Sequence, residues 1–230
     1  MRYFRYDSPV MQLLVKIVMM IWLNLLWILC CIPVFTIGAS CGGYYFATEK
    51  FIRHDHDYAA TQFWRGFKSC FKQNTLLGLA ALALEALMFA SMYLYQKLGD
   101  LGYAIGGFGI VMLLLMVLLA LYTFYLFCYL SRFESTVKNA LRNVLYLFLR
   151  HFGSTLLLAA VFAVCGIVIY VFPVMLFFIP ALGMYCVNRI LEPVFRRYMT
   201  PEQLQREEYI NRPVDKEDWK GSTRDRKEDE

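Results

Sequence analysis

A long apolar run near the N-terminus places the strongest limit on how this chain can fold. Between Val10 and Thr48 the only charged side chain is Lys16. A helix needs roughly 20 apolar residues to cross a bilayer core of about 30 Å, so the run is about twice the length of one crossing. As one straight helix it would extend about 60 Å. The run therefore predicts a membrane-embedded segment that breaks somewhere inside.

Pro33 is the predicted break. Proline removes a helical hydrogen bond, and its ring clashes with the preceding turn. We expect a first span over residues 11–32, where Lys16 lies close enough to the start to extend its amine to the headgroups. We expect residues 33–48 to form a re-entrant or short returning helix, because this segment is too short for a comfortable crossing of its own.

The remaining composition also indicates a membrane protein. Hydrophobic residues make up 59% of the chain and charged residues 18%, which argues against a water-soluble globular domain. Four further apolar stretches predict spans at residues 75–95, 103–130, 154–172 and 173–187. We therefore expect an all-α polytopic membrane protein with five clear transmembrane helices, the short returning segment, and a kink at Pro180. Residues 1–200 are expected to form one membrane domain, and residues 201–230 a charged, flexible cytoplasmic tail.

Two stretches between the spans combine apolar and basic residues at helical spacing. They are residues 63–72 and 132–150, and each predicts a basic amphipathic helix in the plane of the membrane interface. The expected interfacial side chains are Phe63, Trp64, Arg65, Phe67, Lys68, Phe71, Lys72, Lys138 and Arg142. The expected apolar face of the second helix holds Val137, Leu141, Val144, Leu145 and Phe148. The alternative for the first stretch is an ordinary helix in a soluble loop.

The distribution of lysine and arginine predicts the orientation. All the lysines and arginines of residues 1–200 except Lys97 can lie in the cytoplasm if the segment after Pro33 brings the chain back. The tail carries −3 of the chain's net charge of +5, which leaves +8 for residues 1–200. Anionic lipids are the expected partners of this basic rim. Nucleic acid is not an expected partner, because the cations flank spans and alternate with aromatic residues.

The sequence predicts neither an enzyme nor a cofactor or metal site. It has no glycine-rich loop of the Walker type, so we expect no ATP to bind to this chain. The adjacent residues His54, Asp55, His56 and Asp57 cannot readily converge on one ion without other ligands, and we expect a solvated loop there. The seven cysteines lack metal-ligand spacing and are interpreted as packing residues.

Glu85 is the only acidic residue well inside a predicted span. An ionisable group at that depth is costly, so its side chain should face protein or water instead of lipid. It could serve as a gate, a proton site or a substrate contact. It could equally make one structural hydrogen bond between helices, for example to Asn24, and the sequence leaves both readings open.

Small residues are the second candidate feature within the spans. They let helices approach closely where lipid provides no hydrophobic drive for association. The glycines that we expect at helix contacts are Gly38, Gly42, Gly43, Gly106 and Gly109. These contacts could form with a partner protein or only inside this chain.

Three segments resemble the YesL-like family of bacterial integral membrane proteins, described as a domain of unknown function. They are Tyr6-Asp7-Ser8-Pro9, the run from Leu25 through Pro33 to Ser40, and the segment from Phe63 to Asn74. The likeness extends to about Met199. It implies a multi-pass protein of the bacterial cytoplasmic membrane with a role in carbohydrate uptake, since members tend to be encoded beside sugar-import ABC permeases. It implies no catalytic residues.

The leading hypothesis is an accessory or scaffolding subunit of a carbohydrate ABC importer that binds permease subunits through its helices. The alternatives are a small autonomous transporter or channel that uses Glu85, and a membrane sensor that signals through the tail.

The charge distribution makes a testable prediction about topology. Cysteine-accessibility labelling should place the segments around Asp57 and Lys138, and the tail, in the cytoplasm, and should place Gly99 outside, because cations accumulate on the cytoplasmic side. Labelling at Arg2 decides whether the segment after Pro33 returns the chain. External labelling near Lys138 would contradict the orientation.

Overall fold

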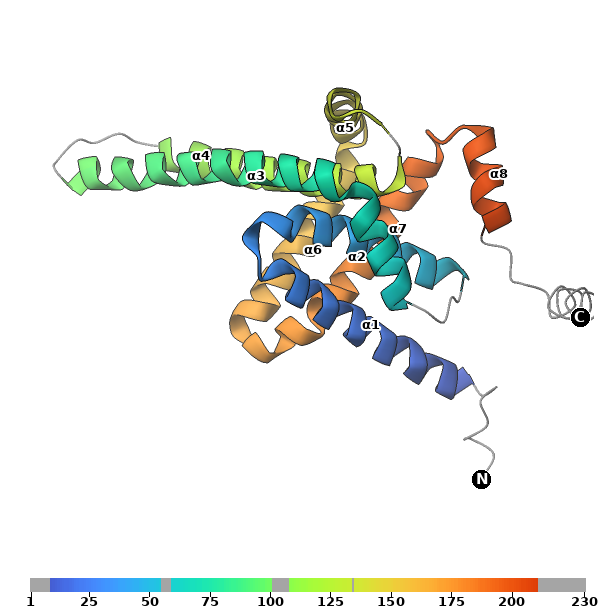
Figure 1. Cartoon of the computed structure of the whole chain (residues 1–230). Helices are drawn as coiled ribbons and strands as arrows, with labels where there is room; N and C mark the ends of the chain where they lie inside the picture. The colour runs from blue at the N-terminus through green and yellow to red at the C-terminus, as the bar shows by residue number, and fades with distance from the viewer. Residues whose placement is uncertain (1–8, 55–58, 101–107, 134, 211–230) are drawn as a thin grey trace, which may run out of the picture.

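The computed structural model describes residues 9–54, 59–100, 108–133 and 135–210, and in these ranges every regular element is a helix (Figure 1). The elements are α1 (Pro9–Cys31), η1 (Val34–Thr36), α2 (Ile37–His54), α3 (Ala59–Asp100), α4 (Phe108–Arg132), α5 (Val137–Arg150), α6 (Phe152–Val171), η2 (Pro173–Phe177), α7 (Ile179–Arg196) and α8 (Pro201–Ile210). The predicted all-α class is confirmed.

The chain breaks at Pro33, as predicted. Helix α1 ends at Cys31, Pro33 is extended (φ −73°, ψ 112°), and α2 begins after one short 3-10 turn. The Thr36 hydroxyl donates to the carbonyl oxygens of Cys30 (2.6 Å) and Pro33 (2.7 Å), and the Ser40 hydroxyl donates to Cys30 (3.0 Å). Side-chain donors thus satisfy carbonyls that the broken helix leaves without partners.

Helix α2 lies at the centre of the fold, where it contacts α1, α3, α4 and α7. Glycines allow this close packing. A Cβ atom on Gly38 would collide with the carbonyl oxygen of Asn74 and lie 2.9 Å from the Phe127 ring. A Cβ on Gly43 would lie 3.0 Å from the backbone nitrogen of Phe67. Since any side chain would separate α2 from α3, these glycines set the distance between the two helices.

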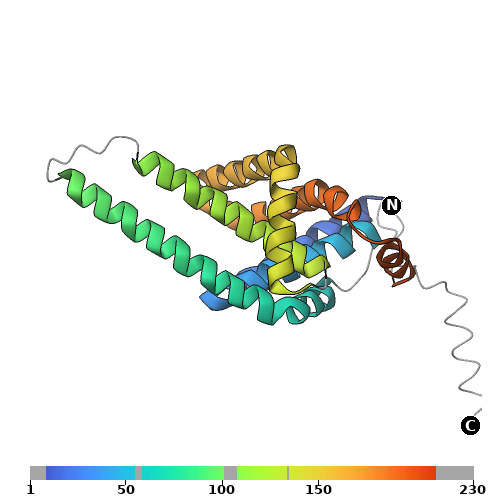
Figure 2. The same cartoon turned by 90° about the horizontal axis from the view of Figure 1, so that it is seen from above.

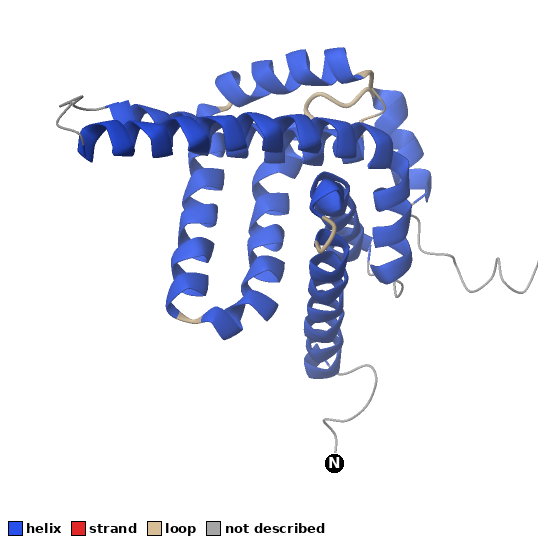
Figure 3. Ribbon diagram, turned by 60° about the vertical axis from the view of Figure 1, so that its left-hand side comes forward, coloured by secondary structure: helices blue, strands red, loops and turns tan. Residues whose placement is uncertain are grey.

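Helix α3 differs from the prediction of a separate surface helix followed by a span. It is one continuous helix of 42 residues. Its first part is bent relative to the rest, as Figures 1 and 3 show. Ser69 and Cys70 both donate side-chain hydrogen bonds to the carbonyl oxygen of Gly66. Such bonds bend helices without ending them, which explains how one helix can follow two directions.

Among the described residues, three helices are long and apolar enough to cross a membrane by length and composition: Ala59–Lys97, Gly109–Arg132 and Phe152–Val171. A shorter apolar helix covers Val18–Cys31. These helices indicate a membrane protein, but the predicted count of five spans is not confirmed. Helices α3 and α4 lie side by side (Figures 1 and 2), and the α6–α7 pair runs in a clearly different direction (Figure 3).

The C-terminal third corrects two further predictions. Pro180 does not kink a span, because α7 starts at Ile179 and Pro180 lies in its first turn. Backbone N–H groups in the first turn have no partner within the helix, so a proline there costs no helical hydrogen bond. Helix α7 also continues past Val187 to Arg196.

Helix α8 occupies residues that were predicted to belong to a flexible tail, while residues 211–230 lie outside the described part. A reciprocal capping box starts α8. The backbone N–H of Thr200 donates to the Gln203 side chain (3.1 Å), and the backbone N–H of Gln203 donates to the Thr200 hydroxyl (3.3 Å).

The packing of α2 makes a prediction about stability. Gly38→Ala should destabilise the protein by about 1–3 kcal/mol, because the new methyl group would collide with the backbone of Asn74 and the buried ring of Phe127. Thermal unfolding in detergent measures the effect. Gly166→Ala is the matched control, since a Cβ there meets no atom within 4 Å. Equal melting temperatures for the two variants would contradict the proposed role of Gly38.

Candidate functional site

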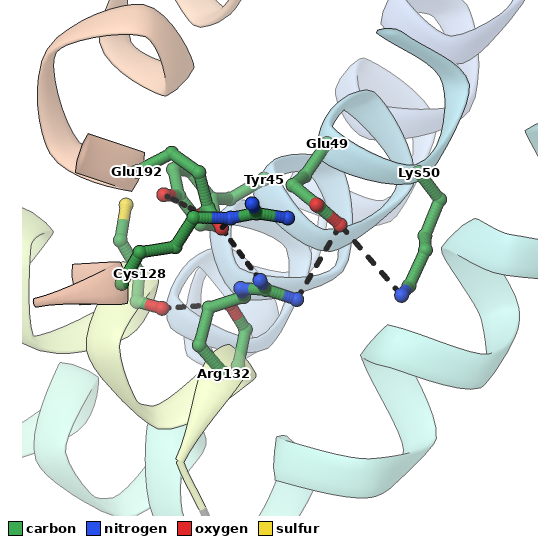
Figure 4. A network of polar contacts seen from close by, with 8 residues as sticks. Tyr45, Glu49, Lys50, Cys128, Arg132 and Glu192 are labelled. Atoms are coloured by element: carbon green, nitrogen blue, oxygen red, sulfur yellow. Dashed lines mark hydrogen bonds and ion pairs between the residues drawn. The ribbon is translucent and has the colours of Figure 1, made fainter. Parts of the chain in front are cut away.

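Charged side chains from three helices that are far apart in the sequence meet in one cluster (Figure 4). Arg132, at the end of α4, donates from Nη2 to Glu192 Oε1 of α7 at 2.6 Å. Its Nη1 lies 3.4 Å from Glu49 Oε2 of α2. The exposed fractions of the Arg132 and Glu49 side chains are 3% and 1%. The charges are therefore almost fully removed from solvent.

Three further residues extend this group, which we call the ion network. Lys50 Nζ lies 3.9 Å from Glu49 Oε2, and Arg196 Nε lies 3.5 Å from Glu192 Oε1. The Tyr45 hydroxyl donates to Glu192 Oε2 at 3.2 Å. Each carboxylate thus faces two cations, which offsets the cost of its burial.

A cluster of aromatic rings adjoins the ion network through Tyr45. Phe195, which is fully buried, makes edge-to-face contacts with Tyr45, Tyr125, Tyr129 and Phe133 at centroid distances of 5.6–6.1 Å. These rings exclude water and lower the local dielectric, so the ion pairs are strengthened and the loss of one partner becomes costly.

The sequence does not predict this network. It indicates Arg132 only as the start of an amphipathic helix, and Lys50, Arg132 and Arg196 only as cations of the cytoplasmic side. The sequence does carry a partial signal. Glu49 and Arg132 closely follow apolar stretches, and Glu192 follows one after Asn188 and Arg189; the arginine has the opposite charge to the two glutamates. Only the tertiary fold shows that these three helix ends meet.

The second site is an apolar groove of about 390 Å³ between helices α2, α3, α4 and α6. We call it the groove. Its lining is Ile37, Gly38, Cys41, Gly78, Ala81, Leu82, Glu85, Val117, Ala120, Leu121, Thr123, Phe124, Phe127 and Phe162. Glu85 contributes the only charged side chain of this lining. Glu85, which the sequence predicts to face protein or water instead of lipid, lines this open groove between the helices.

Asn24 does not pair with Glu85. Its side chain is fully buried and donates to the carbonyl oxygens of Leu176 (3.1 Å) and Phe177 (2.7 Å) in η2. These carbonyls are available because η2 is a short 3-10 segment that leaves its last oxygens without helical partners. Asn24 therefore joins α1 to the tip of the α6–α7 pair.

The predicted interfacial residues of α3 divide into two groups. Phe63 is fully buried in the core, so it does not reach lipid as predicted, because α2 covers that face of the helix. Phe67 and Phe71 are half-buried; the Phe67 ring stacks on Phe63, and the Phe71 ring packs against Phe67 at a tilt. The exposed members are Trp64, Arg65, Lys68 and Lys72.

Helix α5 presents Lys138 and Arg142 on its exposed side, as the sequence indicated. Its buried face is rotated from the predicted one. Leu141 and Leu145 are exposed, and the buried residues are Ala140, Val144, Leu147 and Phe148.

The remaining glycines differ in how closely they are packed. Gly42 packs against Asn74 and Cys70, while a Cβ on Gly109 would meet only Tyr95, at 3.9 Å. Gly106 and Asp55, His56 and Asp57 lie outside the described residues. Within the described ranges, no group of three or more His, Cys, Asp or Glu residues could hold a metal ion.

Comparison with known proteins finds a match, which covers residues 20–92. Residues 20–92 match the family described as Protein of unknown function, DUF624, the domain family of the YesL-like proteins, and this match confirms the resemblance. No curated protein and no solved structure matches the chain. The matched residues include Glu49 and Glu85, whereas Arg132 and Glu192 lie beyond them.

The ion network makes a graded prediction about stability. Arg132→Met should cost about 3–5 kcal/mol, because it leaves Glu49 and Glu192 buried beside fewer cations. Tyr45→Phe should cost only about 1 kcal/mol, since it removes one hydrogen bond to Glu192. Chemical denaturation in detergent ranks the variants.

Arg142→Met is the matched control for Arg132→Met. It removes the same charge from an exposed position on α5 and should leave stability almost unchanged. A loss as large as that of Arg132→Met would show that total charge matters more than the network.

Proposed function

We propose that this chain, whose residues 20–92 match the DUF624 family, is a membrane scaffold that works by helix-helix contact with another membrane protein. The partner that the resemblance implies is the permease pair of a bacterial carbohydrate ABC importer. The protein would be multi-pass in the cytoplasmic membrane, with its C-terminus in the cytoplasm and anionic lipids at its basic rim.

One observation carries the proposal. Helices α3 and α4 continue well beyond the core as a projecting pair (Figures 1 and 2). We call residues 84–100 and 108–118 the arm, since none of their side chains whose burial the structure describes is buried. Large apolar side chains of the arm are exposed, for example Leu87 (65%) and Ile110 (76%). The arm thus contributes little to the core of its own chain, and its surface is available to a neighbour within the membrane.

The core supports this role by holding the base of the arm. The ion network anchors the end of α4, and the glycine contacts of α2 anchor α3. A scaffold benefits from such rigidity, because a preorganised surface loses less conformational entropy on binding.

The groove favours a scaffold over an autonomous transporter. A solute pathway normally presents several polar groups near the bilayer midplane. In the described lining, the Thr123 hydroxyl already donates to the carbonyl oxygen of Leu119 (2.8 Å), which leaves Glu85 as the one charged group facing the space. Water or a polar solute in the groove would therefore find few hydrogen-bond partners in this lining.

Purification in mild detergent tests the proposal. The tagged chain, expressed together with the ABC permease pair encoded beside it, should retain both permeases in a fixed ratio, because apolar helix contacts survive gentle extraction. An equally expressed membrane protein with the same tag is the control.

Recovery of this chain alone and monodisperse from those cells would contradict the scaffold role. Solute uptake by liposomes that contain only this chain would instead support the transporter.

A further inference from the structure

The carboxyl group of Glu85 faces the groove without a partner among the described residues. No hydrogen bond or ion pair joins it to another side chain in those ranges, and it is half-buried. The nearest cations along α3 are Lys72 and Lys97, which stand about 20 Å and about 18 Å away along the helix axis. Neither can reach the carboxyl group, since an ion pair requires contact within about 4 Å.

The other buried charges cannot serve Glu85 either. Arg132 is held by Glu192 and Glu49, and Arg196 contacts Glu192. The structure therefore leaves one acidic group, near the middle of an apolar helix, whose partner must come from outside the described chain. Acyl chains offer no hydrogen bond and no charge, so lipid alone would leave this carboxyl group uncompensated.

The walls of the groove suit the approach of a helix. Ala81 of α3 and Ala120 of α4 line it with small side chains, which permit close contact between helix backbones in a membrane. A volume of about 390 Å³ is too small to enclose a whole helix but holds several side chains. A helix lying along the open side could thus insert a few side chains between α3 and α4.

A second copy of this chain does not supply the missing charge. Between Leu76 and Gln96, and between Phe108 and Leu130, the sequence contains no lysine or arginine. A neighbouring arm would instead bring another Glu85 to the same depth, where like charges repel. Charge complementarity therefore favours a different protein.

We propose that the groove binds one transmembrane helix of a partner protein, and that a lysine or arginine on this helix pairs with the Glu85 carboxylate. The proposal rests on the scaffold function and adds its contact site. An ion pair at this depth explains how an acidic residue can be accommodated in an apolar span, and it selects a partner by charge as well as by shape.

The first test compares two variants in the co-purification experiment. Glu85→Gln keeps the shape and hydrogen-bonding capacity of the side chain but removes its charge, and it should lower the amount of retained permease at least about tenfold. Leu157→Gln is the control. It introduces the same side chain at an exposed position of α6, outside both the arm and the groove, and should retain the permeases as the unmodified chain does.

The second test locates the contact. A photo-crosslinking residue at Ala120, inside the groove, should crosslink to a permease helix that carries a lysine or arginine. The same residue at Ile167, exposed on α6 outside both the arm and the groove, should not.

The results separate this inference from the scaffold function. If the unmodified chain retains no permease, the scaffold function itself fails. If the permeases are retained equally by Glu85→Gln, the contact site is wrong although the scaffold function stands. Crosslinks from Ala120 only to lipid, only to a second copy, or to a helix without a basic residue would also overturn the proposed pairing.

Discussion

The bridge from Arg132 to Glu192 and Glu49 is the interaction on which the rest of the structure depends. Arg132 lies 60 positions from Glu192 and 83 positions from Glu49 in the sequence. Each charge would be very costly to bury alone, so the ends of α2, α4 and α7 are stable in the core only when they meet. This requirement places the base of the arm beside the base of the α6–α7 pair, although the two pairs then run in different directions (Figure 3).

The glycines of α2 supply the second constraint. They bring α2 against α3 at backbone distance, and Asn74 links the helices by donating to the carbonyl oxygen of Gly38 (3.3 Å). Close packing on this side and diverging helices on the other leave the groove between them. The one acidic residue of the apolar part of α3 thus faces a space between helices, which connects the architecture of the core to the proposed recognition of a partner.

Sequence patterns were reliable where a single physical property decided the outcome. The backbone chemistry of Pro33 determined the break, and the periodicity of residues 137–150 determined that α5 is an amphipathic helix. They were less reliable where two properties competed. The polar residues between positions 63 and 74 indicated a helix separate from the following span, but continuous backbone hydrogen bonding and the packing of Phe63 against α2 produced one bent helix instead.

The sequence by itself determined the helical class, the apolar character that suits a membrane, and the presence of one acidic residue deep in a span, because composition and local periodicity carry this information. Only the tertiary structure decided which charges become partners. In the sequence, Glu49, Arg132 and Glu192 resemble ordinary residues at helix ends. The sequence also leaves open whether Glu85 pairs with Asn24 or with another group. The contact of three helix ends and the hydrogen bond from Asn24 to η2 both depend on long-range packing, which no local sequence pattern encodes.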